Sequence, residues 1–134
     1  VLRGNKIENL IDIPNVCAGT VLTIEEAKYC IDNNILIIFS PNLDKKIVNF
    51  CLNNNSIIIP GVYTSTEIKE AYDMGVKVVK YFPVDISNLK TYASVYNKLD
   101  LKYIATGGVN NKNYKEILNI KNVIGVGSSQ IKSI

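Results

Sequence analysis

The stretch Ile35-Leu36-Ile37-Ile38-Phe39 is apolar throughout, and Ile57-Ile58-Ile59 repeats the pattern further along the chain. A strand with one solvated face alternates apolar and polar residues, whereas a parallel strand covered on both faces is apolar at every position. The two stretches therefore predict buried strands of a parallel sheet. Successive strands of such a sheet need crossover connections, which are usually helices.

Short apolar strands of this kind recur along the chain. Consecutive expected starts are roughly 20–25 residues apart, the length of one strand plus one helix, and they fall at Val16, Ile35, Ile57, Val76, Tyr103 and Val123. Helix-start signals stand between them, with a capping-box pattern at Thr23–Glu26, hydroxyl caps at Thr64–Thr66 and an asparagine cluster at Asn110–Asn113. The sequence predicts an α/β fold with a parallel sheet, forming a single domain over residues 1–134.

The composition excludes several classes of protein. The 134 residues are 47% hydrophobic and 20% charged, which is typical of one soluble globular domain. The net charge of +3 is scattered without a basic run, so no nucleic-acid partner is expected, and no apolar run is long enough to predict a membrane partner. Three widely spaced cysteines, Cys17, Cys30 and Cys51, are interpreted as buried, reduced thiols of a cytoplasmic protein.

The chain contains no histidine. This excludes Ser-His-Asp and Cys-His catalysis and the histidine-based zinc motifs, and the cysteine spacing does not match a zinc site either. No zinc site is therefore expected, and no cofactor is expected either. Any chemistry must use lysine, carboxylates, hydroxyls and backbone dipoles.

A lysine stands inside one of the apolar strands, in Val78-Val79-Lys80-Tyr81-Phe82-Pro83. Burial lowers the pKa of a lysine, and a neutral amine can condense with a carbonyl compound to give a Schiff base. The alternative is a lysine at a strand end whose ammonium group extends into solvent.

In folds of this type, functional residues gather where parallel strands end and loops begin. Small and hydroxyl residues stand at these positions, and Thr106-Gly107-Gly108 and Gly127-Ser128-Ser129 are two turns that could bind a phosphate through backbone N–H groups. Gly, Pro and Ser also mark ordinary turns, so only the order of the motifs is informative. Gly125-x-Gly127 lacks the third glycine of a dinucleotide-binding motif.

The ordered series CAGTVLT, SPN, PGVYTSTEI, KYFP, ATGGVNNKNY and GVGSS runs from about Val16 to Ser129. It resembles the 2-keto-3-deoxy-6-phosphogluconate/4-hydroxy-2-oxoglutarate aldolase family. The resemblance implies a class I aldolase that needs no metal, on a (β/α)8 TIM barrel, assembled as a homotrimer. It further implies reversible cleavage of a keto acid, such as a phosphorylated sugar acid, to pyruvate and an aldehyde.

The resemblance also implies roles for individual residues. Lys80 matches the Schiff-base lysine of the family. Arg3 and Thr20 match residues that hold the carboxylate of pyruvate, and Pro41, Phe82 and Thr106 match positions at the substrate. The phosphate end of the site is expected at Gly107, Gly108, Ser128 and Ser129.

The chain departs from the family pattern at both ends. An eight-stranded barrel typically needs at least about 200 residues, and the six strand starts imply a partial barrel that lacks the first two strands and the last helix. By the resemblance, the general-base glutamate falls upstream of Val1. A second hypothesis is therefore a catalytically silent, truncated relative that binds a phosphate or sugar acid, and a third is a different phosphate-binding barrel enzyme.

Carboxylates elsewhere in the chain have a structural interpretation. Glu25, Glu26, Glu67 and Glu70 are expected on solvated helix faces. Asp85 follows Pro83 and could accept a proton near Lys80, although a solvated loop carboxylate is the favoured interpretation.

Overall fold

The computed structural model describes residues 2–3 and 17–128. These residues form one parallel sheet whose strands are hydrogen-bonded in chain order. The seven strands are β1 (Leu2–Arg3), β2 (Cys17–Gly19), β3 (Ile37–Ser40), β4 (Ile57–Val62), β5 (Val78–Tyr81), β6 (Lys102–Thr106) and β7 (Val123–Gly127).

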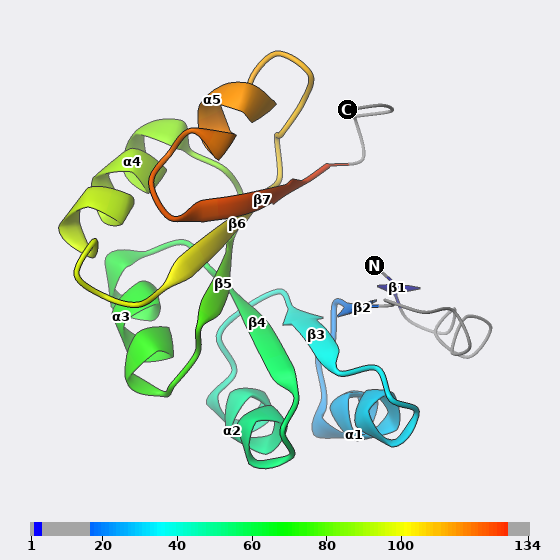
Figure 1. Ribbon diagram of the computed structural model, residues 1–134. Coiled ribbons are helices and arrows are strands. Elements are labelled where there is room, and N and C mark those ends of the chain that lie inside the picture. The colour runs from blue at the N-terminus through cyan, green and yellow to red at the C-terminus, as the bar shows by residue number, and fades with distance from the viewer. Residues whose placement is uncertain (1, 4–16, 129–134) are drawn as a thin grey trace.

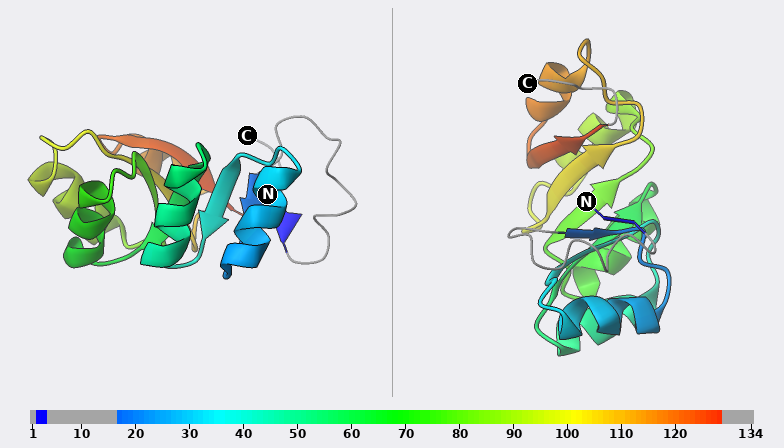
Figure 2. Two further views of the ribbon diagram at one scale, coloured as in Figure 1. Left: turned by 90° about the horizontal axis from the view of Figure 1, so that it is seen from below. Right: turned by 90° about the vertical axis from the view of Figure 1, so that its right-hand side faces the viewer.

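A helix follows each strand from β2 to β6. The helices are α1 (Ile24–Asp32), α2 (Lys45–Asn53), α3 (Ser65–Asp73), α4 (Ile86–Val95) and α5 (Tyr114–Leu118). Figure 1 shows that all five cover the outer face of a curved sheet, and that β1 and β7 form its two edges. Figure 2 shows from two further directions how the sheet twists between the cyan strand β3 and the red strand β7.

The expected barrel-type architecture is confirmed, with two refinements. The six strands expected from the sequence correspond to β2–β7, and Leu2–Arg3 adds a short strand paired with Ala18 and Gly19. Strand β4 also continues beyond the expected stretch Ile57–Ile59, because Pro60 still pairs with β3 and the next two residues pair with β5.

The expected helix starts are also present. Thr64 and Glu67 form a complete capping box at α3. At α1, the Thr23 hydroxyl accepts the N–H of Glu26 at 3.1 Å, but the Glu26 carboxylate accepts the N–H of Leu22 at 2.7 Å. In a capping box the glutamate carboxylate accepts the N–H of the N-cap residue, here Thr23. Glu26 instead accepts the N–H of Leu22, the residue before Thr23.

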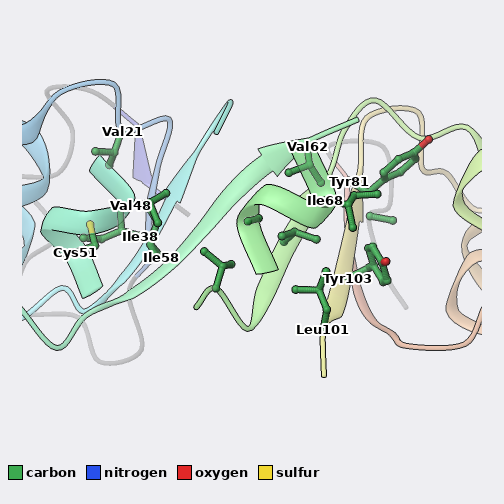
Figure 3. Packing of buried hydrophobic residues seen from close by; sticks show 14 of the residues in the cluster. Val21, Ile38, Val48, Cys51, Ile58, Val62, Ile68, Tyr81, Leu101 and Tyr103 are labelled. Carbon is green, nitrogen blue, oxygen red and sulfur yellow. The ribbon is translucent and has the colours of Figure 1, made fainter. Parts of the chain in front are cut away.

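The hydrophobic core lies between the sheet and the helices. Figure 3 shows Val48 and Cys51 of α2 near Ile38 and Ile58 of the sheet, and the backbone beyond them leads to a second group around Tyr81 and Tyr103. None of the helices in the described part of the chain is long and apolar enough to cross a membrane.

The cysteines meet the sequence expectation in part. All three thiols are free, and Cys30 and Cys51 are buried in the core. Burial, reinforced by the nearby Cys51, raises the pKa of the Cys30 thiol to about 11, so it is un-ionised at neutral pH. Cys17 is only half-buried, because the alternation of β2 turns its neighbour Ala18 toward the helices and leaves Cys17 on the other face.

The Glu67 carboxylate predicts a loss of stability at acid pH. Burial alone would raise its pKa, but the Thr64 and Tyr63 N–H groups, at 2.9 and 3.1 Å, and the Thr64 hydroxyl hold it below 4.5. A lowered pKa stabilises the fold above the unfolded value of about 4.3, and this contribution is lost as the pH falls through the folded pKa. We expect Glu67→Ala to lower the free energy of unfolding by about 1 kcal/mol at pH 7 and by much less near pH 3.

Urea unfolding at the two pH values measures this effect. Glu70→Ala is the matched control, because within the described part of the chain the Glu70 side chain makes only an exposed ion pair with Lys45 at 3.6 Å, worth less than about 1 kcal/mol. An equal loss at both pH values for Glu67→Ala would contradict the carboxylate hydrogen bonds.

The buried phenol of Tyr103 gives a second stability prediction. Its side chain is 1% exposed, and its hydroxyl has no hydrogen-bond partner among the described residues. Burial, followed by the nearby Tyr96, raises its pKa to about 12, because the fold disfavours the ionised phenol, so the free energy of unfolding falls as the pH rises from about 10 toward 12.

We expect Tyr103→Phe to keep or raise the free energy of unfolding at pH 7, by up to about 1 kcal/mol, because it removes an unpaired buried hydroxyl. The decline in stability above pH 10 should also become shallower. Urea unfolding from pH 7 to 11 measures both effects, with Tyr29→Phe as the control at a 38% exposed site. A loss of more than about 1 kcal/mol would mean that the Tyr103 hydroxyl has a partner.

Candidate active site

Strand alternation turns Lys80 away from the helices. Val79 and Tyr81 are buried in the core, so Lys80, between them, lies on the inner face of the sheet, where it is half-buried. Its register partners are Gly61 of β4 and Ile104 of β6. The strand lysine identified from the sequence is therefore near the carboxyl end of β5 with a glycine directly beside it.

Gly61 permits a close approach of the loop after β3. A Cβ at this position would lie 2.1 Å from the carbonyl oxygen of Pro41, so no side chain can be accommodated without moving the backbone. The buried Ser40 hydroxyl donates to the carbonyl of Asn42 at 2.9 Å and holds the turn. The predicted site residue Pro41 is thus packed against the strand neighbour of Lys80.

Phe82 and Gly107 form the next part of the site. The Lys80 ammonium nitrogen, Nζ, lies over the Phe82 ring at 5.1 Å from its centroid. The ring is 44% exposed, and a Cβ at Gly107 would lie 2.8 Å from its Cδ2 atom. The structure therefore brings Lys80, Phe82 and Gly107 together, as the sequence motifs predict.

The loop after β6 has positive φ values at both of its glycines. Gly107 and Gly108 have φ values of +84° and +89°, which side chains rarely adopt. The Asn113 amide donates to the carbonyl of Gly108 at 2.9 Å, and the N–H of Asn110 donates to the Asn113 side-chain oxygen at 2.8 Å. Among the residues that the structure describes, no atom lies within 4 Å of the Cβ position of Gly108, so they leave the space beside it open.

Strand β7 contacts the same loop. The Ser128 hydroxyl donates a hydrogen bond to the carbonyl of Val109, and a Cβ at Gly127 would lie 2.9 Å from the Cγ2 atom of Thr106. Thr106, Gly107, Gly108 and Ser128 therefore belong to one corner of the sheet. Ser129 lies outside the described residues.

The two residues predicted to hold the carboxylate of pyruvate lie toward the opposite edge of the sheet. Thr20 follows β2, is exposed and has a φ of +61°, a strained value for a β-branched residue. The backbone of Arg3 pairs with Gly19 in β1. The Arg3 side chain lies outside the described part of the structure.

The carboxylates near the site have structural roles. Asp85 is the N-cap of α4, where it accepts the N–H of Asn88 at 3.0 Å, and Glu67 caps α3. The structural interpretation of Asp85 is therefore the better one. Among the described residues, no three cysteine, aspartate or glutamate side chains gather in a way that could hold a metal ion.

The supporting roles of Gly61 and of the Asn110–Asn113 pair are not among those predicted from the sequence. A glycine directly after the proline in PGV signals a close backbone approach. Two asparagines three residues apart after a glycine turn are typical of side chains that hydrogen-bond local backbone groups. Both signals could have identified these residues as supports of the site.

Known proteins resemble this chain over most of its length. Residues 5–134 match the family model "KDPG and KHG aldolase". The chain is 33% identical to the 2-dehydro-3-deoxy-phosphogluconate aldolase of Haemophilus influenzae over 133 residues, covering 96% of this chain and 59% of that protein. It is 32% identical to the enzyme of the same name from Treponema pallidum over 116 residues, covering 84% of this chain and 54% of that protein.

Solved structures agree on the fold. A KDPG aldolase of Legionella pneumophila, described with pyruvate captured as a covalent carbinolamine intermediate, matches with a TM-score of 0.81 and 30% identity over 91% of this chain and 60% of that chain. The KDPG aldolase of Zymomonas mobilis with 3-phosphoglycerate matches with a TM-score of 0.84 and 24% identity, covering 92% and 61% of the two chains.

This chain thus spans between half and three-fifths of the length of the two curated relatives named here. The family match extends over nearly all of it. Together with the parallel β/α sheet and the ordered strand-end motifs, it shows that the chain belongs to the KDPG and KHG aldolase family.

Proposed function

We propose that this protein is a class I aldolase in which Lys80 forms a Schiff base with a 2-keto acid and releases pyruvate. The observation that carries the proposal is the position of Lys80, half-buried on the inner face of β5 between Gly61 and Ile104, in a chain of this family. Gly61 lets the Pro41 carbonyl pack closely against the strand beside Lys80, and the Phe82 ring, which rests on Gly107, faces the amine.

The proposed reaction begins with attack of the neutral Lys80 amine on the C2 carbonyl of the keto acid. The carbonyl oxygen leaves as water, with one proton from the amine and one from solution, and a protonated imine remains. A base takes the proton of the C4 hydroxyl, the C3–C4 bond breaks, and its electrons pass into the imine to give an enamine. Protonation of the enamine and hydrolysis then release pyruvate and the lysine.

Two ends of the site would hold the rest of the substrate. Thr20 and Arg3 would bind the carboxylate next to the reacting carbonyl, and Thr106 would contact the substrate near Lys80. Gly107, Gly108, Ser128 and Ser129 would bind a terminal phosphate, which favours a 2-keto-3-deoxy-6-phospho sugar acid over 4-hydroxy-2-oxoglutarate. The open space beside Gly108 supports this assignment. We also expect a homotrimer.

A single trapping experiment tests the role of Lys80. Incubation of the purified protein with pyruvate and borohydride should give one reduced adduct, mapped to Lys80 by mass spectrometry. Lys80→Met should abolish the adduct and change the free energy of unfolding by less than about 1 kcal/mol, because Lys80 is only half-buried.

Lys102→Met is the matched control, because Lys102 lies in β6 in register with Val78, two positions before the partner of Lys80. This variant should keep the adduct. Binding of a phosphorylated sugar acid without any adduct would instead favour the catalytically silent relative. An adduct that persists in Lys80→Met would exclude Lys80 as the nucleophile.

Thr20 provides a prediction that separates stability from binding. Because its φ of +61° is strained for a β-branched residue, Thr20→Gly should raise the free energy of unfolding by up to about 1 kcal/mol. The same variant should form the pyruvate adduct less readily, because the carboxylate loses the threonine hydroxyl. Thr20→Ser keeps the hydroxyl and should retain the adduct. Urea unfolding and adduct yield at limiting pyruvate measure the two effects, and an unchanged yield in Thr20→Gly would contradict the binding role.

A further inference from the structure

The Phe82 ring lies beside the charge that the proposed reaction uses. Lys80 and Phe82 are two residues apart, so both side chains lie on the inner face of the sheet. The Lys80 Nζ atom lies over the ring at 5.1 Å from its centroid. A cation within about 6 Å over an aromatic face is attracted by the negative potential of the ring.

The position of the ring is fixed by its neighbours. A Cβ at Gly107 would lie 2.8 and 2.9 Å from the Cδ2 and Cε2 atoms, so one edge of the ring rests where Gly107 has no side chain. The N–H of Val84 donates to the carbonyl of Gly107 at 2.9 Å, and the N–H of Phe82 donates to the carbonyl of Val62 at 3.1 Å. The backbone of Phe82 is thus held by β4, and its ring rests on the loop after β6.

We propose that the face of the Phe82 ring stabilises the positive charge on Nζ of Lys80, first as the ammonium ion and then as the protonated imine, and that Gly107 is the positioning residue that admits the ring. The role in the imine rests on the proposed function. The protonated imine keeps the charge on the same nitrogen, whereas the enamine formed after bond cleavage is neutral. The ring thus favours the charged imine, which is the form that accepts electrons from the breaking bond.

Strands β4 to β7 contain one charged residue besides Lys80. Across β4 to β7, Lys102 of β6 is the other charged residue, and its ammonium group donates to the Asn122 side chain at 3.1 Å. Lys102 is present in every variant below, so its effect cancels in the comparison.

The test compares Phe82→Leu with Phe82→Tyr. Leucine keeps an apolar side chain but removes the aromatic face, and tyrosine keeps both. NMR titration of the purified protein, labelled at the lysine Cε carbon, follows deprotonation of Lys80, with Lys80→Met identifying its signal. The midpoint should shift downward by about 0.5 pH unit in Phe82→Leu and return to the original value in Phe82→Tyr.

A second readout follows the imine. Exchange of the pyruvate methyl protons for deuterium requires the protonated imine, so exchange should fall as the pH rises and the imine loses its proton. The pH at which it has fallen by half should move downward by a similar amount in Phe82→Leu but not in Phe82→Tyr. Gly107→Ala, which displaces the ring, should shift the lysine midpoint in the same direction. Should it fail to fold, the two Phe82 variants still decide the question.

The outcomes separate this proposal from the proposed function. If the lysine midpoint shifts but no variant exchanges pyruvate protons, the contact between the ring and the charge is supported and the aldolase assignment fails. If exchange proceeds and both midpoints are the same for phenylalanine and leucine, Phe82 serves only for packing and the proposal is overturned.

Discussion

The burial of Val79 and Tyr81 against the helices is the constraint on which the site depends. Because side chains alternate along a strand, anchoring these two residues in the core directs Lys80 and Phe82 to the opposite face. The parallel register with β4 and β6 then places Gly61 on one side of Lys80 and Ile104 on the other. The position of a polar amine is thus a consequence of how apolar side chains pack.

Three glycines allow the backbone and side chains around the amine to approach closely. Gly61 admits the Pro41 carbonyl, Gly107 admits the Phe82 ring and Gly127 admits the Thr106 methyl group. In each case a Cβ would lie less than 3 Å from its neighbour, a distance at which something must shift. These contacts link the ends of β3 and β4 and the ends of β5, β6 and β7, and the pairing of β4 with β5 joins the two groups into one surface.

The polar groups that support the site are mostly engaged with local backbone. Asp85 and Glu67 cap helices, Ser40 holds the turn around Pro41, and Asn113 holds Gly108. These hydrogen bonds stabilise the loops at the carboxyl edge of the sheet without carrying the chemistry. Because these polar groups are bonded to local backbone, the arrangement is consistent with a reaction in which the Lys80 nitrogen forms the covalent bond and an aromatic ring faces its charge.

The sequence by itself determined the βα repeat, the parallel strands and the strand lysine, because unbroken apolar stretches and helix caps are local signals. The ordered strand-end motifs also sufficed for the family, whereas the roles of the candidate site residues stay predictions. The tertiary structure alone decided that β4 continues through Pro60 to Val62, that Cys17 is half-buried and that Asp85 caps a helix. It also decided which glycines matter, because a close approach such as Pro41 over Gly61 is set by register and packing between strands distant in the chain. Local patterns predict elements, whereas contacts between elements depend on how all of them pack together.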